Sequence, residues 1–588
     1  MPRKQVKSLK HLREIINSQN WINNIDSDEN ECLDIVELPP NQVDQLSDLE
    51  DLDDDIINDE EPDDVPGDIE IHYQQKKKKS TKNNSFVSKW QKIEPKYSKT
   101  YPTVEIQERK NRLIEELKGK TPVECFEKLF DEFIISDIVK HSLIYSRQNN
   151  DHNFHVSNEC IKKFIGILLF SGYHSVPQER LYWSEDEDFD INFIRKCMTR
   201  NRYMEIKKYI HFSDNSELLS IPSEERDKLF KIRPLLEKLN QNFLKFGVFS
   251  KFLSIDEQMV RYFGHHYLKQ FIRAKPIRFG FKQWAICCSE TGYCYRMDVY
   301  EGKSTTNTKE TGVTGLGASV VAKMVSILDQ PEQHEIFFDS FFTGFSLMKY
   351  LNDINVRATG TCRFDRMNKC PLTKDKEMKK KSRGTYDYQF DTKNEILAIT
   401  WMDNSCVKLL SNHETIEPLS WAKRWSRSEK KEITISQPKL INQYNKYMGG
   451  VDKMDWNVQK YRIKIRGKKW YFPLVTNAID VALVNSYVLY CMANDQISLL
   501  DYRRTVARAY LTLSSDLSDP KQQGRKALPK SSLTRVPVDI RLSGNHVIER
   551  TEMGRQRKCA ICKANARKEC KKCNVGLHME CFIKWHKK

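Results

Sequence analysis

Apolar residues recur at helical spacing between residues 105 and 250. The tract CIKKFIGILLFSGY (160–173) predicts a buried helix, and MTRNRYMEIKKYIHF (198–212) predicts an amphipathic one. A third stripe lies on one helix face and consists of Leu229, Ile232, Leu236, Leu239, Phe243 and Phe246. We therefore expect this part of the chain to be mainly helical, with these stripes in its core.

The pattern changes to strands after residue 250. KFLSIDEQMV (251–260) predicts a strand that ends near Asp256, and QWAICCSETGYCYRMDVYEG (283–302) predicts a hairpin with its turn at 290–292. A helical stripe, the strand EIFFD, a further helix and the strand VRATGTCR follow. Three strands, a helix, a strand, a helix and a strand is the order of a ribonuclease H-like fold, although other mixed α/β sheets share it.

Short strand-like runs, YDYQF, ILAITWM and VKLLS, lie between polar segments in residues 365–436. They predict a small β-rich insertion that interrupts the ribonuclease H-like part. INQYNKYMGGVDKMDWNVQKY (441–461) then predicts a helix whose start is broken by glycine. Asp452, Asp455 and Gln459 share one face of this helix.

One apolar segment, FPLVTNAIDVALVNSYVLYCMA (472–493), is long enough to suggest a membrane span. Asn477, Asp480 and Asn485 lie inside it, and no second span accompanies it. We therefore expect a buried helix in a protein that does not associate with membranes.

Charge is distributed unevenly along the 588 residues, a length that predicts two to four domains. Residues 24–70 contain 20 Asp or Glu and no Lys or Arg, so the rest of the chain has 96 basic residues against 60 acidic ones, a formal charge of +36. This excess favours a polyanionic partner, most simply nucleic acid, over a merely solvated basic surface. The basic patch QQKKKKSTK (74–82) is a candidate nuclear import signal, and an anion-binding patch or a solvated linker explains it equally well.

These patterns divide the chain into seven segments. They are an acidic region with a basic patch that we expect to be disordered (1–104), a first helical part (105–250), the first part of a ribonuclease H-like fold (251–364), the β-rich insertion (365–436), the last part of the ribonuclease H-like fold (437–461), a second, basic helical part (462–540) and a Cys/His-rich module (541–588).

The stretch EIFFDSFFTG (335–344) sets the carboxylate of Asp339 among four phenylalanines, which is costly unless something compensates the charge. A salt bridge or a helix cap would suffice, but a cation is the sharper hypothesis. In a ribonuclease H-like sheet the strands that end in Asp256 and Asp339 are neighbours, and Asp452 on a packed helix could join them. Three convergent carboxylates favour Mg²⁺ or Mn²⁺ and suit two-metal phosphoryl transfer.

Several blocks resemble the core of piggyBac transposases and piggyBac transposable element-derived proteins. They are SIDEQMVRYFGHH, KPIRFGFK, IFFDSFFTG and YNKYMGGVDKMDW, with MTRNRYMEIKKYIHFSDN and RIKIRGKKWYF on either side. The likeness runs from about residue 120 to the C-terminus, in the order and with the spacings of that family.

The resemblance implies that Asp256, Asp339 and Asp452 are the catalytic triad and that Asp455 is a further acid important for activity. It also implies double-stranded DNA as partner, cleavage at terminal inverted repeats, a hairpin intermediate, joining at TTAA targets and a homodimer. By the same resemblance, residues 105–250 and 462–540 are the two parts of a helical dimerisation and DNA-binding domain, and 251–364 and 437–461 are the two parts of the catalytic domain. Trp470 matches a family tryptophan that contacts DNA. The further candidate DNA contacts lie in two basic segments and are Lys275, Arg278, Lys282, Lys468 and Lys469.

The chain ends in a cysteine module whose spacing predicts zinc sites. Since the sequence begins MPRKQVKSLK, without an apolar secretory core, we expect an intracellular and reducing location and metal ligands rather than disulfides. Paired thiolates and imidazoles at these spacings bind Zn²⁺. One site would use Cys559, Cys562, His578 and Cys581, and a cross-braced second site would use Cys570, Cys573, His586 and, as the hypothetical eighth ligand, His546.

Two functions remain open at this point. The first is a metal-dependent DNA transposase in the nucleus, which the intact acids favour. The second is a domesticated nuclear protein that binds DNA or chromatin without transposing, because some relatives have lost triad acids and serve the host. The zinc module does not separate them, since related modules bind terminal repeats or histone tails.

Overall fold

The protein is described here by a computed structural model that resolves two compact units. The described residues are 87–101, 107–222, 225–272, 277–302, 313, 315–427, 429–513, 536, 541–542, 545–551 and 556–587, with the backbone of three strands nearer the N-terminus. The first unit comprises 1–130, 168–179 and 236–506, and the second comprises the remaining segments.

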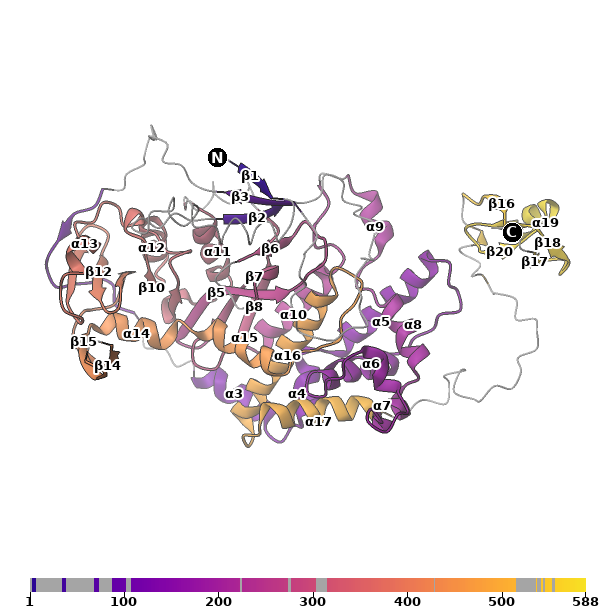
Figure 1. Ribbon diagram of the computed structural model, residues 1–588, viewed down its shortest axis with the longest axis horizontal. Helices are drawn as coiled ribbons and strands as arrows, with labels where there is room; N and C mark the ends of the chain where they lie inside the picture. Colours follow the sequence, from indigo (N-terminus) through magenta and orange to yellow (C-terminus); the bar gives the residue numbers. More distant parts are fainter. Residues whose placement is uncertain are drawn as a thin grey trace. The chain divides into compact units, whose positions relative to one another are not determined.

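A ten-stranded mixed sheet forms the centre of the first unit (Figure 1). Its order is β4-β11-β12-β13-β10-β9-β5-β7-β6, and β8 also pairs with β7. The strands are β4 (Trp90–Gln91), β5 (Phe252–Arg261), β6 (Lys269–Phe271), β7 (Phe279–Cys288), β8 (Cys294–Val299), β9 (Glu335–Phe338), β10 (Arg357–Thr361), β11 (Tyr386–Asp391), β12 (Ile396–Met402) and β13 (Cys406–Ser411).

Helices cross between the strands and pack against them. Those of the first unit are α3 (Gln107–Leu117), α4 (Pro122–Leu129), most of α10 (Arg233–Phe246), α11 (Leu316–Val325), α12 (Phe345–Asp353), α13 (Asp375–Met378), α14 (Lys439–Tyr447), α15 (Gly450–Lys460), α16 (Phe472–Ala493) and most of α17 (Leu499–Leu511). α15 lies against β5 and β7, and α12 lies against β10.

The predicted ribonuclease H-like fold is present as the order β8-β7-β5-β9-β10. β5 is antiparallel to β7 and parallel to β9, which is parallel to β10, and α11 and α12 lie in the connections. The expectation that the first strand ends near Asp256 was wrong. β5 continues to Arg261 because it keeps pairing with β7 up to Gly280 after its pairing with β9 has stopped.

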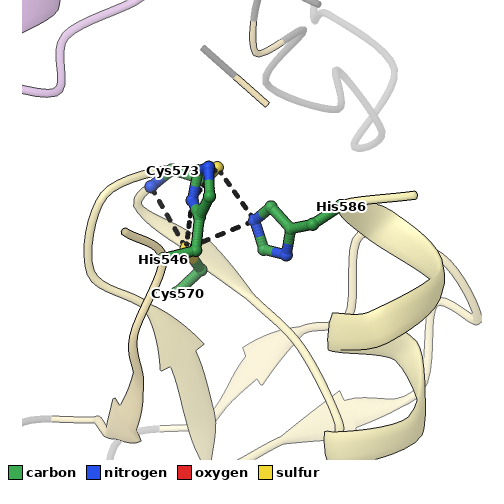
Figure 2. Close-up of side chains that lie close together, drawn as sticks. All are labelled: His546, Cys570, Cys573 and His586. Carbon is green, nitrogen blue, oxygen red and sulfur yellow. Dashed lines mark hydrogen bonds between the residues drawn. The ribbon is translucent and has the colours of Figure 1, made fainter. Parts of the chain in front are cut away.

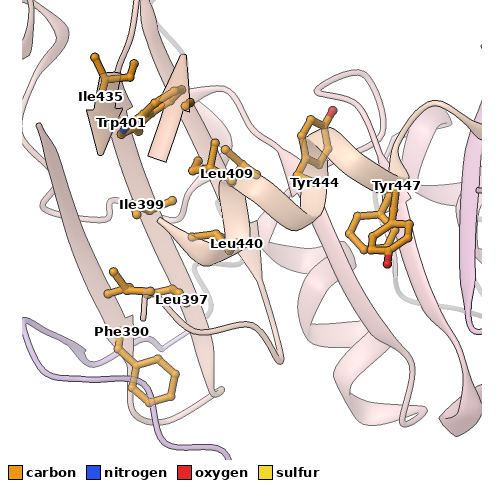
Figure 3. Close-up of a cluster of buried hydrophobic side chains, with 13 residues drawn as sticks. Phe390, Leu397, Ile399, Trp401, Leu409, Ile435, Leu440, Tyr444 and Tyr447 are labelled. Carbon is orange, nitrogen blue, oxygen red and sulfur yellow. The ribbon is translucent and has the colours of Figure 1, made fainter. Parts of the chain in front are cut away.

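The strands expected in the insertion form, but they extend the main sheet. β13 pairs antiparallel with β10, and β12, β11 and β4 follow. Only the hairpin of β14 (Ser420–Ser426) and β15 (Lys431–Gln437) stands apart as a two-stranded sheet. A shared apolar cluster joins these strands to α14, with Trp401, Leu409, Leu440 and Tyr444 among its members (Figure 3).

Part of the N-terminal segment predicted to be disordered is ordered. Residues 87–101 run along the edge of the sheet, where Trp90 packs edge-on against Phe345 and the Tyr97 hydroxyl donates to the Glu414 carbonyl (2.7 Å). Nearer the N-terminus, three strands pair antiparallel: β1 (Arg3–Val6), β2 (Asp34–Leu38) and β3 (Asp68–His72). The rest of the acidic segment lies outside the described residues.

The apolar segment 472–493 forms α16, the one described helix long and apolar enough to cross a membrane, and 83% of its most apolar window is buried within the protein. Its polar residues have partners in that interior. Asn485 donates to and accepts from the backbone of Cys294 (2.8 Å each). Asp480 lies 2.8 Å from Arg503 and accepts from the Ile463 N–H (2.9 Å). These contacts are those of a core helix.

We expect Arg503→Met to lower the free energy of unfolding by about 3–5 kcal/mol, because it leaves a buried carboxylate without its partner. Both side chains are 2% exposed, and burial raises the pKa of Asp480. Urea unfolding measures the loss. The double variant Asp480→Asn/Arg503→Met should recover part of the stability, and a single variant as stable as the parent would contradict a role for the pair.

The second unit contains helices and the cysteine module. Its helices are α5 (Glu132–Gln148), most of α6 (Asn158–Ser171), α7 (Asn192–Cys197), α8 (Arg200–Tyr209), α9 (Asn215–Ser220) and α19 (Met579–Trp585). Its short strands are β16 (Ile548–Arg550), β17 (Arg557–Lys558), β18 (Asn565–Ala566), β19 (Lys568–Cys570) and β20 (Val575–Gly576). Phe164 on α6 stacks on Tyr203 of α8 (5.0 Å between ring centroids), as the predicted apolar stripes require.

Candidate active site and metal centres

Asp256 and Asp339 lie next to each other where two parallel strands stop pairing. The last pair between β5 and β9 is Ile255 with Phe338; Asp256 is the next residue on β5, and Asp339 directly follows the end of β9. Asp256 is 7% exposed and Asp339 is half-buried. The sheet register therefore sets these two carboxylates side by side.

Asp452 is brought to the same place by the first turn of α15. The Val451 N–H donates to the Ser254 hydroxyl (3.2 Å), two residues before Asp256 on β5. A side chain at Gly450 would meet that hydroxyl at 2.4 Å and the Cys288 carbonyl at 2.7 Å, so only glycine lets the helix start so close to the sheet. Asp452 is exposed at this start.

The charges of all three carboxylates affect the pKa of the Tyr444 hydroxyl. Burial raises its pKa, and the charges of Asp339, Asp256 and Asp452 raise it further. Tyr444 lies 3.3 Å from the Thr361 hydroxyl, and Thr361 directly follows the β9–β10 pair of Phe338 and Gly360. The three acids, on β5, directly after β9 and on α15, are therefore all close enough to Tyr444 for their charges to act on its hydroxyl. Neither Tyr444 nor Thr361 was identified from the sequence, since neither has a spacing signal.

Asp455 fixes α15 to the sheet and to α16. Asp455 Oδ1 accepts a hydrogen bond from the Gln258 side-chain amide (2.8 Å), and Gln258 Oε1 accepts one from the Asn477 side chain (3.2 Å). The Gln459 side-chain amide also donates to Asp455 Oδ1 (3.4 Å). This chain of amides positions Asp455 as a support for the helix that carries Asp452.

The start of β9 is held by a buried ionic network that the sequence did not reveal. Glu335 lies 2.8 Å from Arg357 and 3.2 Å from Lys251. Burial raises the pKa of Glu335, but His413, Arg357 and Lys251 outweigh it and lower that pKa to about 2. Glu335, His413 and Glu414 are close enough to share a metal, but basic side chains already pair with both carboxylates. The network therefore anchors the strand that leads to Asp339.

The candidate DNA contacts differ in exposure. Arg278 and Lys468 are exposed, and Lys275 lies outside the described residues. Lys282 lies over the Trp284 ring (4.1 Å) and 3.7 Å from Glu257.

Two of the candidates, Lys469 and Trp470, are buried at 3% and 6% exposure. The Trp470 ring stacks on His266 (4.0 Å between centroids), a partner distant in sequence. In this conformation Trp470 supports its loop from within, and its contact with DNA stays a prediction.

The eight predicted zinc ligands lie in two groups of four, and within each group the ligand atoms are within 4.8 Å of one another. Figure 2 shows His546, Cys570, Cys573 and His586 turned toward one another. Their sulfur–nitrogen distances are 3.3–3.5 Å. An edge of about 3.5 Å is expected when thiolate and imidazole bind one tetrahedral Zn²⁺.

The other group contains Cys559, Cys562, His578 and Cys581. The Cys562 sulfur lies 3.3 Å from His578 Nδ1. Burial raises the pKa of Cys559, but neighbouring backbone N–H groups outweigh it and lower that pKa to about 6. A thiolate is therefore favoured at Cys559 at neutral pH. Burial and the thiols of Cys559 and Cys562 raise the pKa of Cys581 to about 11, so a bound cation would be needed to make it a thiolate. Both groups have the donor set and spacing to hold zinc.

Comparison with known proteins finds similarity to transposases and to proteins derived from them. A family model described as Transposase IS4 matches residues 121–487. The PiggyBac transposable element-derived protein 3 of Homo sapiens is 38% identical over 473 residues, which cover 79% of this chain and 76% of that protein. The human PiggyBac transposable element-derived protein 2 is 35% identical over 479 residues, covering 80% and 78%.

A solved structure has the same fold. It is a cryo-EM structure of a piggyBac transposase synaptic complex with hairpin DNA, 20% identical, with a TM-score of 0.56. The match covers 79% of this chain and 98% of that one.

Proposed function

Because the chain belongs to the piggyBac family of transposases and transposable element-derived proteins, we propose that it is a DNA transposase that cuts and joins strands at the ends of a transposon. The observation that carries this proposal is the convergence of Asp256, Asp339 and Asp452 where the β5–β9 pairing ends. Three acids whose charges all act on the Tyr444 hydroxyl form a group that suits cations.

The three carboxylates would hold Mg²⁺ or Mn²⁺, hard cations that prefer oxygen ligands. Bound cations would make the attacking oxygen nucleophilic and stabilise the leaving oxygen of a phosphodiester. The chain supplies the positions: the β5–β9 register sets Asp256 beside Asp339, Gly450 lets Asp452 approach, and Asp455 holds its helix through Gln258. By family resemblance, the freed 3′-hydroxyl would attack the opposite strand, which forms a hairpin and releases the flanking DNA. Water would then open the hairpin, and the 3′-hydroxyl freed again would attack a phosphodiester of a TTAA target.

The proposed partners follow from the same assignment. They are double-stranded DNA at terminal inverted repeats, TTAA target DNA and a second copy of the chain. The basic remainder of the chain would bind phosphates. Two Zn²⁺ ions would stabilise the C-terminal module, and the reaction would take place in the nucleus.

The test is strand cleavage by the purified protein on DNA taken from the ends of its own element. We expect nicks at the element ends only when Mg²⁺ or Mn²⁺ is added. The triple variant Asp256→Asn/Asp339→Asn/Asp452→Asn serves as the matched control. Cleavage that survives in the folded triple variant would exclude this active site.

The names of the human relatives favour a second candidate, a host protein derived from a transposon that binds DNA without transposing. Genomic DNA around the coding sequence separates the two. Short inverted repeats bounded by TTAA support a mobile element, and their absence together with a failure to cleave would favour the second candidate.

The acidic segment should compete with DNA for the basic remainder of the chain. Deleting residues 24–70 removes 20 acids from a chain whose remainder has a formal charge of +36. Since phosphate binding releases counterions and depends steeply on salt, the deletion should tighten nonspecific DNA binding most at low salt. Fluorescence anisotropy against salt concentration measures this. Equal affinities for both chains at low salt would remove autoinhibition by this segment.

A further inference from the structure

The β14–β15 hairpin has one face in the core and one in solvent. Ala422 and Ile435 are members of the apolar cluster, and the Trp401 indole N–H donates to the Ser436 carbonyl (2.9 Å). Successive residues of a strand point to opposite faces. The face away from the core therefore carries the alternate residues of β14.

Two tryptophans dominate that outer face. Trp421 is 71% exposed and Trp425 is 60% exposed, and exposed Lys423 lies between them. At about 3.4 Å per residue, neighbouring side chains on this face are about 7 Å apart. We call Trp421, Lys423 and Trp425 the outer stripe. Among the described residues, no aromatic ring or cation covers either indole.

The outer stripe lies in a basic hairpin. Residues 420–437 contain five Lys or Arg and two Glu. Arg424 is held by Asp403 (3.0 Å) and Lys431 by Glu429 (2.9 Å), whereas Lys423, Arg427 and Lys430 are exposed. A large aromatic surface with an excess of positive charge complements an aromatic polyanion.

We propose that the outer stripe binds DNA with unpaired bases, each indole stacking on a base and Lys423 contacting the phosphates between them. Stacking needs the open face of a base, which a duplex keeps inside its own stack, so unpaired DNA fits better than duplex. Indole–base stacking and a basic track are the common features of proteins that bind single strands. Tryptophan is also common in protein interfaces, but lysine is depleted there, so Lys423 between the two indoles favours DNA over a protein partner.

This site is independent of the three carboxylates and adds to the proposed function a place that holds a strand after it leaves the duplex. The experiment measures binding of a labelled oligothymidylate and of a duplex of equal length to the full chain, without added Mg²⁺. We expect Trp421→Ala and Trp425→Ala each to weaken oligothymidylate binding about 5- to 100-fold, the range for loss of one stacked base. Duplex affinity should change less than twofold.

Three further variants separate stacking from other effects. Trp421→Phe/Trp425→Phe should keep most of the affinity, because phenylalanine still stacks. Lys423→Gln should reduce the salt dependence of oligothymidylate binding. Phe133→Ala changes a phenylalanine outside the hairpin that is 74% exposed. It should change neither the affinity for oligothymidylate nor the salt dependence of that binding.

Unchanged oligothymidylate affinity in Trp421→Ala/Trp425→Ala with an unchanged melting temperature would overturn the proposal. Equal losses for single strand and duplex would also overturn it, and so would a defect confined to self-association in sedimentation, which would assign the face to protein. Metal-dependent cleavage of element ends is measured in a separate assay. The single-strand binding proposed for the outer stripe can therefore be rejected while the proposed function stands, and the proposed function can be rejected while that binding stands.

Discussion

Asp339→Asn is expected to reduce metal-dependent strand cleavage at least about a thousandfold, because a lost cation site removes several kcal/mol of transition-state stabilisation and each 1.4 kcal/mol is tenfold. The asparagine keeps the local structure. Asp339 Oδ1 accepts from the Phe341 N–H (2.9 Å), and the amide oxygen of asparagine can accept the same bond. Only the charge is removed.

The melting temperature and the cleavage rate of Asp339→Asn together distinguish a metal-binding role of Asp339 from a purely structural one. If Asp339 holds a cation, the melting temperature should stay the same or rise, since mutual repulsion of the carboxylates is relieved. Asp256→Asn/Asp339→Asn should be no less active than either single variant, because the acids act as one unit. Asp353→Asn, at an exposed acid that ends α12, should leave cleavage unchanged. A folded Asp339→Asn that cleaves well would reject the metal role.

The second large effect concerns zinc. The full chain should contain two zinc ions, and Cys573→Ser should lose one of them and unfold the C-terminal module. Its apolar core has eight buried residues, five of them ligands or their neighbours in the chain, so little besides metal would hold it together. Structural zinc contributes about 10–16 kcal/mol to such modules. Metal analysis by mass spectrometry gives the stoichiometry, and limited proteolysis reports the unfolding.

His546→Ala tests the ligand that the sequence marked least clearly. We expect zinc at the second site to be lost or to bind more weakly. Cys406→Ser changes a cysteine outside both groups and should leave two zinc ions in place. Two tightly bound ions in His546→Ala would show that another residue or water completes the second site.

The strand order of the catalytic core follows from local patterns, because the alternation in KFLSIDEQMV and the apolar run EIFF are strong signals. The limits of α16 follow equally well, since an apolar run of that length has one plausible structure. The place where β5 ends does not follow. It depends on whether β7 is long enough to keep pairing after β9 stops, and that is a tertiary property.

In the candidate site too, some residues could be predicted from local sequence and others depend on the tertiary structure. Asp339 stands out because a charge among phenylalanines is costly, whereas Tyr444 and Gln258 are ordinary residues until the fold brings them to the acids. The burial of Trp470 comes from His266, more than two hundred positions earlier. The extension of the sheet by β13 likewise depends on a free edge of β10 that no local pattern marks.

Asp256, Asp339 and Asp452 are far apart in the sequence, and this has a consequence for the synthesis of the chain. Asp256 and Asp339 are joined by a register that forms before the insertion is made, but Asp452 follows the insertion. Because proteins emerge from the ribosome N-terminus first, a nascent chain holds two of the acids while the third is still to be translated. Any fragment that stops before Gly450 lacks Asp452, so under the proposed function premature termination would yield products without the full set of three acids.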